Sequence, residues 1–390
     1  RGLGDVYKRQ ICASYPKANI WIIPSVESPQ VYRNYAQTSK VHLEMARGEV
    51  EHIQLVFPSK VNEEYRFTFD RYLKGIQISA RELKKMNGYY DALVPFKNQL
   101  KCTDTLTAVW ITVQCPSRVP VGKYHQTIKI EGSKHFTIQL DYNVHHTTIP
   151  LKSSIPITVG VENRCMTECL NDKEADKERQ RWVDFVLSYR MTPVFGTQIT
   201  PERWQYEHSF SPWAWNDKRS IRLLNDRRYS CYMLPFFTLS ENELASLLCN
   251  IQKKGKLKES LFYIWDEPAY MEDYEQIKRK VNIIRKYASD ARILTTFFCG
   301  PRNGPRKGDL YAVFDYLKHH IHVATISLAP CKGNEEEVQH IRYKVPEGID
   351  WWSYVCWQPG GNEPNFLLQM KGIQQRAVSY THLTLPTIRL

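Results

Sequence analysis

Short runs in which apolar and polar residues alternate fill the first part of the chain. They are rich in β-branched and aromatic residues and are separated by turn residues. The runs are HIQLVF, YRFTF, TAVWITVQC, YHQTIKI and HFTIQLDYNV. Alternation at this spacing is typical of strands with one buried face. The pattern predicts an antiparallel β-sandwich domain over residues 11–150.

After residue 150 the pattern changes to nearly continuous apolar runs that alternate with helical segments. Seven of these runs are predicted to be strands, at 155–161, 193–196, 231–237, 261–265, 292–298, 322–328 and 351–357. Such runs are typical of parallel strands that are covered on both faces. The chain is therefore predicted to be multidomain, β plus α/β.

Helices are predicted between these strands. Segment 172–190 places Trp182, Phe185, Val186 and Tyr189 at helical spacing, so these side chains should form one apolar face. Further helices are expected over 241–253 and after the strand at 261–265.

Seven strand and helix units are one fewer than the eight of a closed barrel. We expect residues 151–377 to be a (β/α)8 TIM-type barrel that is truncated after strand seven. An open, doubly wound sheet is the alternative, although the chain has no G-x-G-x-x-G motif or P-loop to support it.

Both ends of the chain look like translated sequencing adapters. RGLGDVYKRQ begins the chain and VSYTHLTLPT lies near its end, so we expect residues 1–10 and 378–390 to be artefacts. A signal peptide would then lie upstream of residue 11. No run approaches the roughly 20 apolar residues of a membrane-spanning helix, so no transmembrane segment is expected.

The net charge of +12 comes from basic residues that are dispersed among acidic ones, as in KEADKERQR. This distribution favours a solvated surface over a polyanion site, with an acidic glycan as the remaining alternative. No basic stripe is interleaved with aromatic residues, so no nucleic-acid partner is expected. Cys165 and Cys169 have no second ligand pair nearby, and we expect neither a metal nor an organic cofactor.

The segment LFYIWDEPAY carries the strongest chemical signal. It places Asp266 and Glu267 directly after a predicted barrel strand, where barrel enzymes build their active sites. Pro268 ends the strand and should favour extended geometry at Glu267. The competing interpretation is that Asp266 caps the following helix while Glu267 forms a surface ion pair.

Adjacent carboxylates repel each other, so we expect one to be protonated and the other ionised. This pair suits substrate-assisted hydrolysis, in which the 2-acetamido carbonyl of the sugar attacks its own anomeric carbon. We predict that Asp266 orients the acetamido N–H and that Glu267 protonates the leaving oxygen and later activates water. A conventional glycosidase with Glu162 as the second carboxylate is an alternative.

Aromatic residues supply two candidate sugar platforms. The seventh predicted strand carries Trp351, Trp352, Tyr354 and Trp357. The loop after the second strand carries Trp204, Trp213 and Trp215. Flat rings stack on sugars, but the same residues could fill the barrel interior or pack a long loop onto the barrel.

Four motifs, YIWDEP, WWSYVCW with NEPNF behind it, GEVEHIQLVF and VPVGKY, resemble glycoside hydrolase family 123 and the related domain of unknown function 4091. Known members are exo-acting β-N-acetylgalactosaminidases with a β-sandwich before a barrel. The resemblance implies that Asp266 orients the acetamido group and that Glu267 is the acid/base. The residues that match the strand-seven motif, and are implied to lie near the substrate, are Trp351, Trp352, Tyr354 and Asn365.

The predicted function is therefore that of a retaining exo-β-N-acetylhexosaminidase, foremost a β-N-acetylgalactosaminidase. Its partner would be a glycan with a terminal N-acetylhexosamine, and the resemblance implies a periplasmic or extracellular location. The alternative is a non-catalytic glycan-binding protein that kept the barrel. The presence of both carboxylates favours the enzyme.

Overall fold

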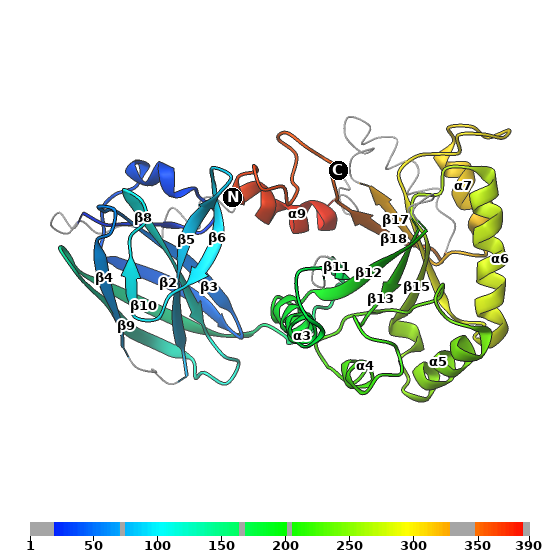
Figure 1. The fold of residues 1–390 in the computed structure, drawn as a ribbon, viewed down its shortest axis with the longest axis horizontal. Coiled ribbons are helices and arrows are strands. Elements are labelled where there is room, and N and C mark those ends of the chain that lie inside the picture. The colour runs from blue at the N-terminus through cyan, green and yellow to red at the C-terminus, as the bar shows by residue number, and fades with distance from the viewer. Residues whose placement is uncertain (1–18, 71–74, 164–167, 201–204, 328–347, 385–390) are drawn as a thin grey trace. The chain divides into compact units, whose positions relative to one another are not determined.

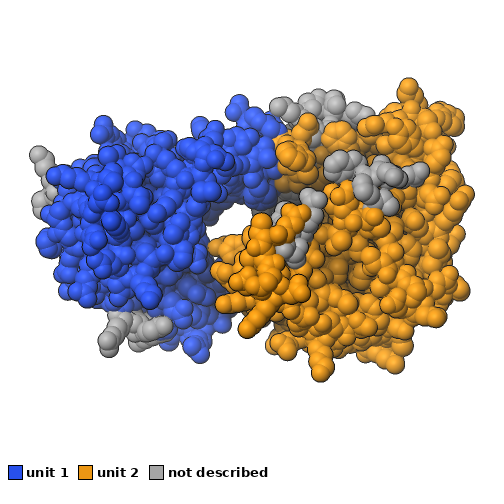
Figure 2. Space-filling view, in the orientation of Figure 1, with its two compact units in different colours: residues 1–150, 360–379 blue, residues 151–359, 380–390 orange. Residues whose placement is uncertain are grey.

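The computed structural model describes residues 19–70, 75–163, 168–200, 205–327 and 348–384. The chain divides into two compact units, which Figure 2 distinguishes by colour. Unit 1 holds residues 1–150 with 360–379, and unit 2 holds residues 151–359 with 380–390. The terminal segment 1–10 lies outside the described residues, whereas residues 378–384 form the end of helix α9 (Gly372–Thr384).

Unit 1 contains two five-stranded sheets and a short 3-10 helix, η1 (Pro29–Asn34). The first sheet has the order β1 (Trp21–Pro24), β3 (Val50–Pro58), β8 (Leu106–Gln114), β5 (Gln77–Met86) and β6 (Tyr89–Pro95). The second has the order β2 (Lys40–Arg47), β10 (His135–Thr148), β9 (Gly122–Glu131), β4 (Glu64–Phe69) and β7 (Gln99–Lys101). Neighbouring strands are antiparallel except β2 and β10, which pair in parallel.

Strand alternation builds the core of unit 1. Leu55 and Val109 of the first sheet and Tyr65 and Ile138 of the second are fully buried in one cluster. Each such side chain contributes roughly 1.5–3 kcal/mol by leaving water. Both sheets therefore contribute side chains to one core.

Unit 2 contains a parallel sheet in which the strand order follows the chain. The strands are β14 (Tyr232–Met233), β15 (Ser260–Trp265), β16 (Arg292–Phe297), β17 (Val323–Ser327) and β18 (Asp350–Tyr354). Figure 1 shows the helices that lie along one side of it, α5 (Glu241–Lys253), α6 (Met271–Tyr287) and α7 (Leu310–Leu317), while η3 (Leu257–Glu259) precedes β15. This sheet and its helices form a half-barrel.

A three-stranded sheet comes earlier in unit 2. It pairs β11 (Thr158–Glu162) in parallel with β12 (Thr192–Thr200), and β12 antiparallel with β13 (Gln205–Ser209). The associated helices are α3 (Asp172–Ser188) and α4 (Lys218–Leu223). The seven predicted strands fall on β11, β12 and β14–β18. Strand β13 was expected to be loop, because its sequence QYEHS has no apolar run to signal a strand.

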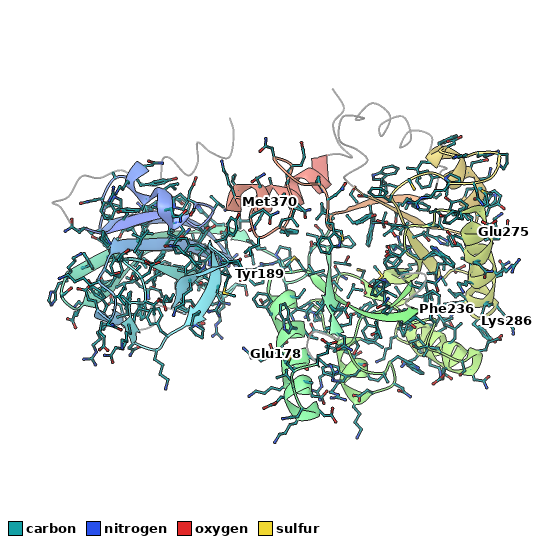
Figure 3. All side chains as sticks on the ribbon, turned by 45° about the horizontal axis from the view of Figure 1, so that its top comes forward. Glu178, Tyr189, Phe236, Glu275, Lys286 and Met370 are labelled. Carbon is teal, nitrogen blue, oxygen red and sulfur yellow. The ribbon has the colours of Figure 1, made fainter. Side chains whose placement is uncertain are left out.

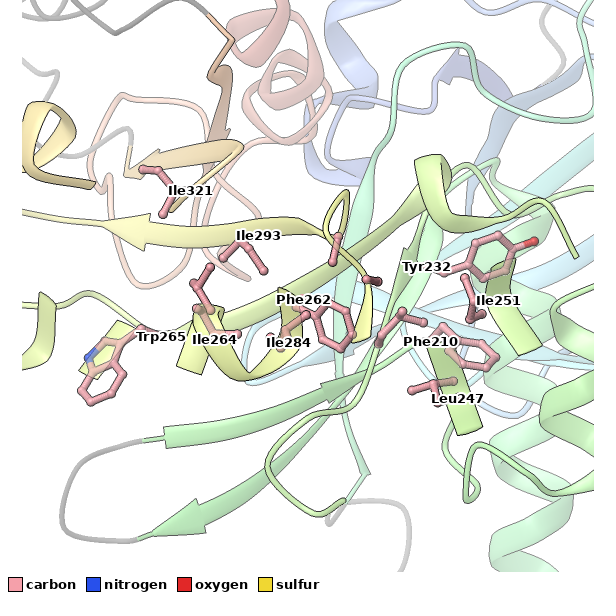
Figure 4. Close-up of a cluster of buried hydrophobic side chains, with 14 of the residues drawn as sticks. Phe210, Tyr232, Leu247, Ile251, Phe262, Ile264, Trp265, Ile284, Ile293 and Ile321 are labelled. Carbon is pink, nitrogen blue, oxygen red and sulfur yellow. The ribbon is translucent and has the colours of Figure 1, made fainter. Parts of the chain in front are cut away.

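Two clusters cover the two faces of the half-barrel sheet. The helix-side cluster joins Phe262, Ile264 and Ile293 to buried residues of the helices, as Figure 4 shows in close-up. The inner cluster, on the opposite face, consists of Val194, Cys231, Met233, Leu261, Leu294 and Val323. Charged side chains such as Glu275 and Lys286 lie on the outer side of α6 (Figure 3).

Helix α3 buries a different face from the one predicted. Val183, Val186 and Leu187 are buried, whereas Trp182, Phe185 and Tyr189 are 39%, 50% and 48% exposed. The three exposed rings pack edge to face, with centroids 5.7 and 5.1 Å apart. The aliphatic side chains, which are smaller than the rings, pack into the core of unit 2. Only Val186 of the predicted face is therefore buried.

Candidate active site

The end of strand β15 places Asp266 on the inner face of the half-barrel. Leu261 and Tyr263 contact the inner cluster, while Phe262 and Ile264 belong to the helix-side cluster. The pairing of β15 with β16 then shifts by one residue between Tyr263 and Trp265, and Trp265 also joins the helix-side cluster. Such an irregularity reverses the alternation, so Asp266 faces the same side as Tyr263.

One oxygen of Asp266 carries two hydrogen bonds. Its Oδ1 accepts from the hydroxyl of Tyr263 at 2.6 Å and from that of Thr296 at 2.9 Å. Burial, with the charge of Asp266, raises the pKa of Tyr263, so this hydroxyl keeps its proton and donates it. Within the described ranges Oδ2 accepts no hydrogen bond, and Asp266 remains partly exposed.

Glu267 has a backbone φ of 45°, in the left-handed region. The prediction of extended geometry before Pro268 is therefore wrong. The Glu267 N–H donates to Thr296 Oγ1 at 2.9 Å, and the carboxylate Oε1 accepts a hydrogen bond from Tyr354. These contacts offset a conformational cost of roughly 1–3 kcal/mol, of the kind that is concentrated at functional sites.

The structure does not support the helix-cap interpretation of Asp266. Helix α6 has Tyr270 at its N-cap, and the carboxylate of Asp273 accepts from the N–H groups of Ala269 and Tyr270 at 3.0 and 2.9 Å. Glu267 is exposed and is bonded to a tyrosine hydroxyl rather than to a cation of the described chain. Neither carboxylate therefore makes the contact that this interpretation requires.

The aromatic residues of β18 alternate between the two faces of the sheet. Trp351 packs against the helix-side cluster, with its ring 6.1 Å from that of Phe314. Trp352 packs against the inner cluster, and Tyr354 bonds Glu267. Burial, together with the hydrogen bond to Glu267, raises the pKa of Tyr354, so it remains a donor. Of the predicted substrate contacts, Trp352 and Tyr354 therefore share the face of the carboxylates, and Trp351 lies on the other.

Two other predicted residues belong to other elements of the chain. Asn365 belongs to unit 1, where it is buried and its Oδ1 accepts from the N–H of Phe366 at 2.7 Å. Glu162 is the exposed last residue of β11, in the three-stranded sheet. The roles predicted for Asn365 and Glu162 stay predictions.

Three residues that sequence reasoning missed complete the site: Tyr263, Thr296 and His208. The ring of His208, on β13, stacks on that of Tyr263 with centroids 4.0 Å apart. Burial lowers the pKa of His208 to about 4, so the imidazole is neutral at neutral pH. For Tyr263 and Thr296, the signal in the sequence was a side chain with a hydroxyl inside an otherwise apolar strand.

The tryptophans after β12 are explained by packing. Trp213 is 9% exposed, donates its indole N–H to Asp176 at 3.0 Å and lies beneath the guanidinium of Arg219. Trp215 packs against the helix-side cluster. Trp204 lies outside the described residues.

The described part of the chain contains no group of three or more metal-ligating side chains. Cys165 of the suggested cysteine pair lies outside it. Nor does any described helix have the length and apolarity to cross a membrane.

No family model matches the sequence, and no curated protein matches it. Among solved structures, the chain is similar to a family 123 glycoside hydrolase from Clostridium perfringens whose structural analysis concerns glycolipid glycan hydrolysis. The two are 13% identical, with 94% of this chain and 76% of that chain covered and a TM-score of 0.58.

Two weaker matches are also carbohydrate-active enzymes. The FMN-binding β-glucuronidase from Facaelibacterium prausnitzii is 10% identical, with 89% of this chain and 50% of that chain covered and a TM-score of 0.29. A family 5 xyloglucanase from Bacteroides ovatus is 10% identical, with 80% and 69% covered and a TM-score of 0.19. Neither score is high enough to indicate a shared fold. The TM-score of 0.58 does indicate one, so the chain has a fold similar to that of the family 123 glycoside hydrolase.

Proposed function

We propose that this chain is a glycoside hydrolase that removes a terminal N-acetylhexosamine from glycans, foremost N-acetylgalactosamine. The observation that carries the proposal is the Asp266–Glu267 pair at the C-terminal end of β15, where Asp266 is held by a hydroxyl from β16 and Glu267 by a hydroxyl from β18. The fold similarity to a family 123 enzyme supports the same class of activity.

Asp266 is suited to orient the acetamido group. Two hydroxyl donors hold Oδ1 in place, and Oδ2 can accept the substrate N–H. The acetamido carbonyl oxygen then forms a bond to the anomeric carbon while the glycosidic bond breaks. The carboxylate stabilises the positive charge that develops on the resulting oxazolinium ring.

Glu267 is suited to move the proton. It is exposed, so both the leaving oxygen and water can reach it. In the first step it gives its proton to the leaving oxygen. In the second step it takes a proton from water, which attacks the anomeric carbon and reopens the ring. Two successive inversions give overall retention.

The proposal extends to the architecture and the location of the protein. We infer that unit 1 is a β-sandwich, since its two sheets share one core, and that the half-barrel sheet belongs to a (β/α)8 barrel. Trp352 is the strand-seven tryptophan that we assign to the substrate side. We place the protein outside the cytoplasm on the family resemblance alone.

The test is hydrolysis of paired aryl β-GalNAc and β-GlcNAc substrates by the chain, with and without a thiazoline inhibitor that mimics the oxazolinium intermediate. Turnover of one sugar that the inhibitor blocks is expected. Glu267→Gln should lose at least about 100-fold in kcat, since it cannot donate or accept the proton. Glu272→Gln, on the exposed first turn of α6, is the matched control and should keep normal activity.

Normal turnover by Glu267→Gln would show that another group is the acid. Absence of both turnover and inhibitor binding in the unaltered chain would refute the proposed hydrolase. Glycan binding without turnover would favour the non-catalytic alternative instead.

A further inference from the structure

Thr296 contacts both residues of the Asp266–Glu267 pair. It is the last but one residue of β16, and it is 6% exposed. Its hydroxyl donates to Asp266 Oδ1 and accepts from the N–H of Glu267, both at 2.9 Å. One side chain on a neighbouring strand thus holds the carboxylate of one residue and the backbone of the next.

The number of hydroxyl protons limits which hydrogen bonds these three side chains can form at the same time. Tyr263, Thr296 and Asp266 lie within hydrogen-bond distance of one another, at 2.6, 2.9 and 2.9 Å, but the two hydroxyls supply one proton each. The contact between Tyr263 and Asp266 is the shortest and lies in the range of a hydroxyl bonded to a charged oxygen. If both protons point to Oδ1, the lone pairs of Thr296 are left to accept the N–H of Glu267. The geometry therefore fits an arrangement in which both hydroxyls donate to Oδ1 while Thr296 accepts from Glu267.

The backbone of Glu267 depends on the same hydroxyl. A left-handed residue costs free energy and persists only where its surroundings hold it. The N–H of Glu267 has left the strand ladder, and Thr296 supplies its acceptor in place of a carbonyl. In this backbone conformation, Oε1 of Glu267 accepts a hydrogen bond from Tyr354 on β18.

Titratable and polar side chains of several strands surround this arrangement. The titratable groups that face the two carboxylates are Tyr263 on β15, Tyr354 on β18 and, stacked on Tyr263, His208 on β13. The preceding residue of β16, Thr295, is fully buried, and its hydroxyl has no hydrogen-bond partner in the described structure. It is a buried threonine of the same strand that does not contact the carboxylate pair.

We propose that Thr296 is a positioning residue that sets the relative placement of the orienting carboxylate and the acid/base through its one hydroxyl. It ties the side chain of Asp266 to the backbone of Glu267, leaving Oδ2 of Asp266 directed to the substrate. This assignment rests on the proposed glycoside hydrolase function, because that function gives the two carboxylates separate roles.

The experiment compares Thr296→Val with Thr296→Ser, and Thr295→Val is the matched control. Valine keeps the shape of threonine and removes both hydrogen bonds, whereas serine keeps the hydroxyl. We expect Thr296→Val to lower kcat on the aryl substrate by about 10- to 100-fold with little change in KM, since it removes a hydrogen bond to a charged group. Thr296→Ser should recover most of the rate, and Thr295→Val should behave as the unaltered chain.

A structural readout separates positioning from general destabilisation. Crystal structures of the unaltered chain and Thr296→Val should show Glu267 leaving the left-handed region or the carboxylate of Asp266 rotating away from Tyr263.

The outcomes distinguish this inference from the proposed function. If the unaltered chain hydrolyses substrate and Thr296→Val matches Thr295→Val in kcat and KM, the positioning role is refuted while the function stands. If the unaltered chain hydrolyses nothing, the proposed function fails, and the crystal structures then test the positioning role by themselves. An unmoved Asp266–Glu267 pair in Thr296→Val would then overturn the positioning role as well.

Discussion

His208 should make the stability of unit 2 depend on pH. Its imidazole is stacked on Tyr263, and burial lowers its pKa from 6.5 to about 4. Because the pKa in the folded state lies below that of the unfolded state, protons bind preferentially to the unfolded chain. The stabilisation from the neutral imidazole is fully present above pH 6.5 and is lost progressively as the pH falls toward 4.

The magnitude follows from the size of the shift. With one unit equal to about 1.4 kcal/mol, unit 2 should lose about 2 kcal/mol on going from pH 7 to pH 5, and about 3 kcal/mol by pH 4. His208→Phe keeps an aromatic ring against Tyr263 but cannot bind a proton. Between pH 7 and pH 5, its free energy of unfolding should therefore fall by about 2 kcal/mol less than that of the unaltered chain.

Urea unfolding of both proteins at pH 7, 6, 5 and 4 measures the effect, with near-ultraviolet circular dichroism as the probe. His52 in unit 1 provides a control, because burial also lowers its pKa to about 4. His52→Phe should change the pH dependence of a transition in unit 1 and leave that of unit 2 intact. Equal pH dependence of the unfolding of unit 2 in the unaltered chain and His208→Phe would refute the reasoning.

Two further predictions concern the hydrogen bond from Tyr354 to Glu267 and the buried face of helix α6. Tyr354→Phe removes the donor to Glu267 and should lower kcat by about 10-fold or more in the aryl-substrate assay, whereas Tyr287→Phe, which frees a surface glutamate, should have no effect. Ile277→Ala on α6, where the side chain is fully buried, should destabilise unit 2 by about 2–5 kcal/mol in urea unfolding. Ile283→Ala on the same helix, at 38% exposure, is the control, and an equal loss in both would contradict the assigned core face.

The sequence determined the order of the elements and the place of the carboxylate pair along the chain. The apolar runs at 231–237, 261–265 and 292–298 carry enough local signal to predict strands, because burial on both faces demands continuous apolar residues. The placement of adjacent Asp and Glu at the end of such a strand was also readable, since it depends only on residue order and on the end of one element.

Only the tertiary structure decided how the pair is held. Thr296 lies 30 residues from Asp266 along the chain, and Tyr354 lies 87 residues from Glu267. Their contacts depend on which strands are neighbours and on a one-residue shift between β15 and β16, and no local pattern encodes either. The left-handed Glu267 follows from those contacts against the local preference imposed by Pro268. The buried face of α3 was likewise decided by its fit to the sheet, because an apolar stripe does not specify which of its residues the core accepts.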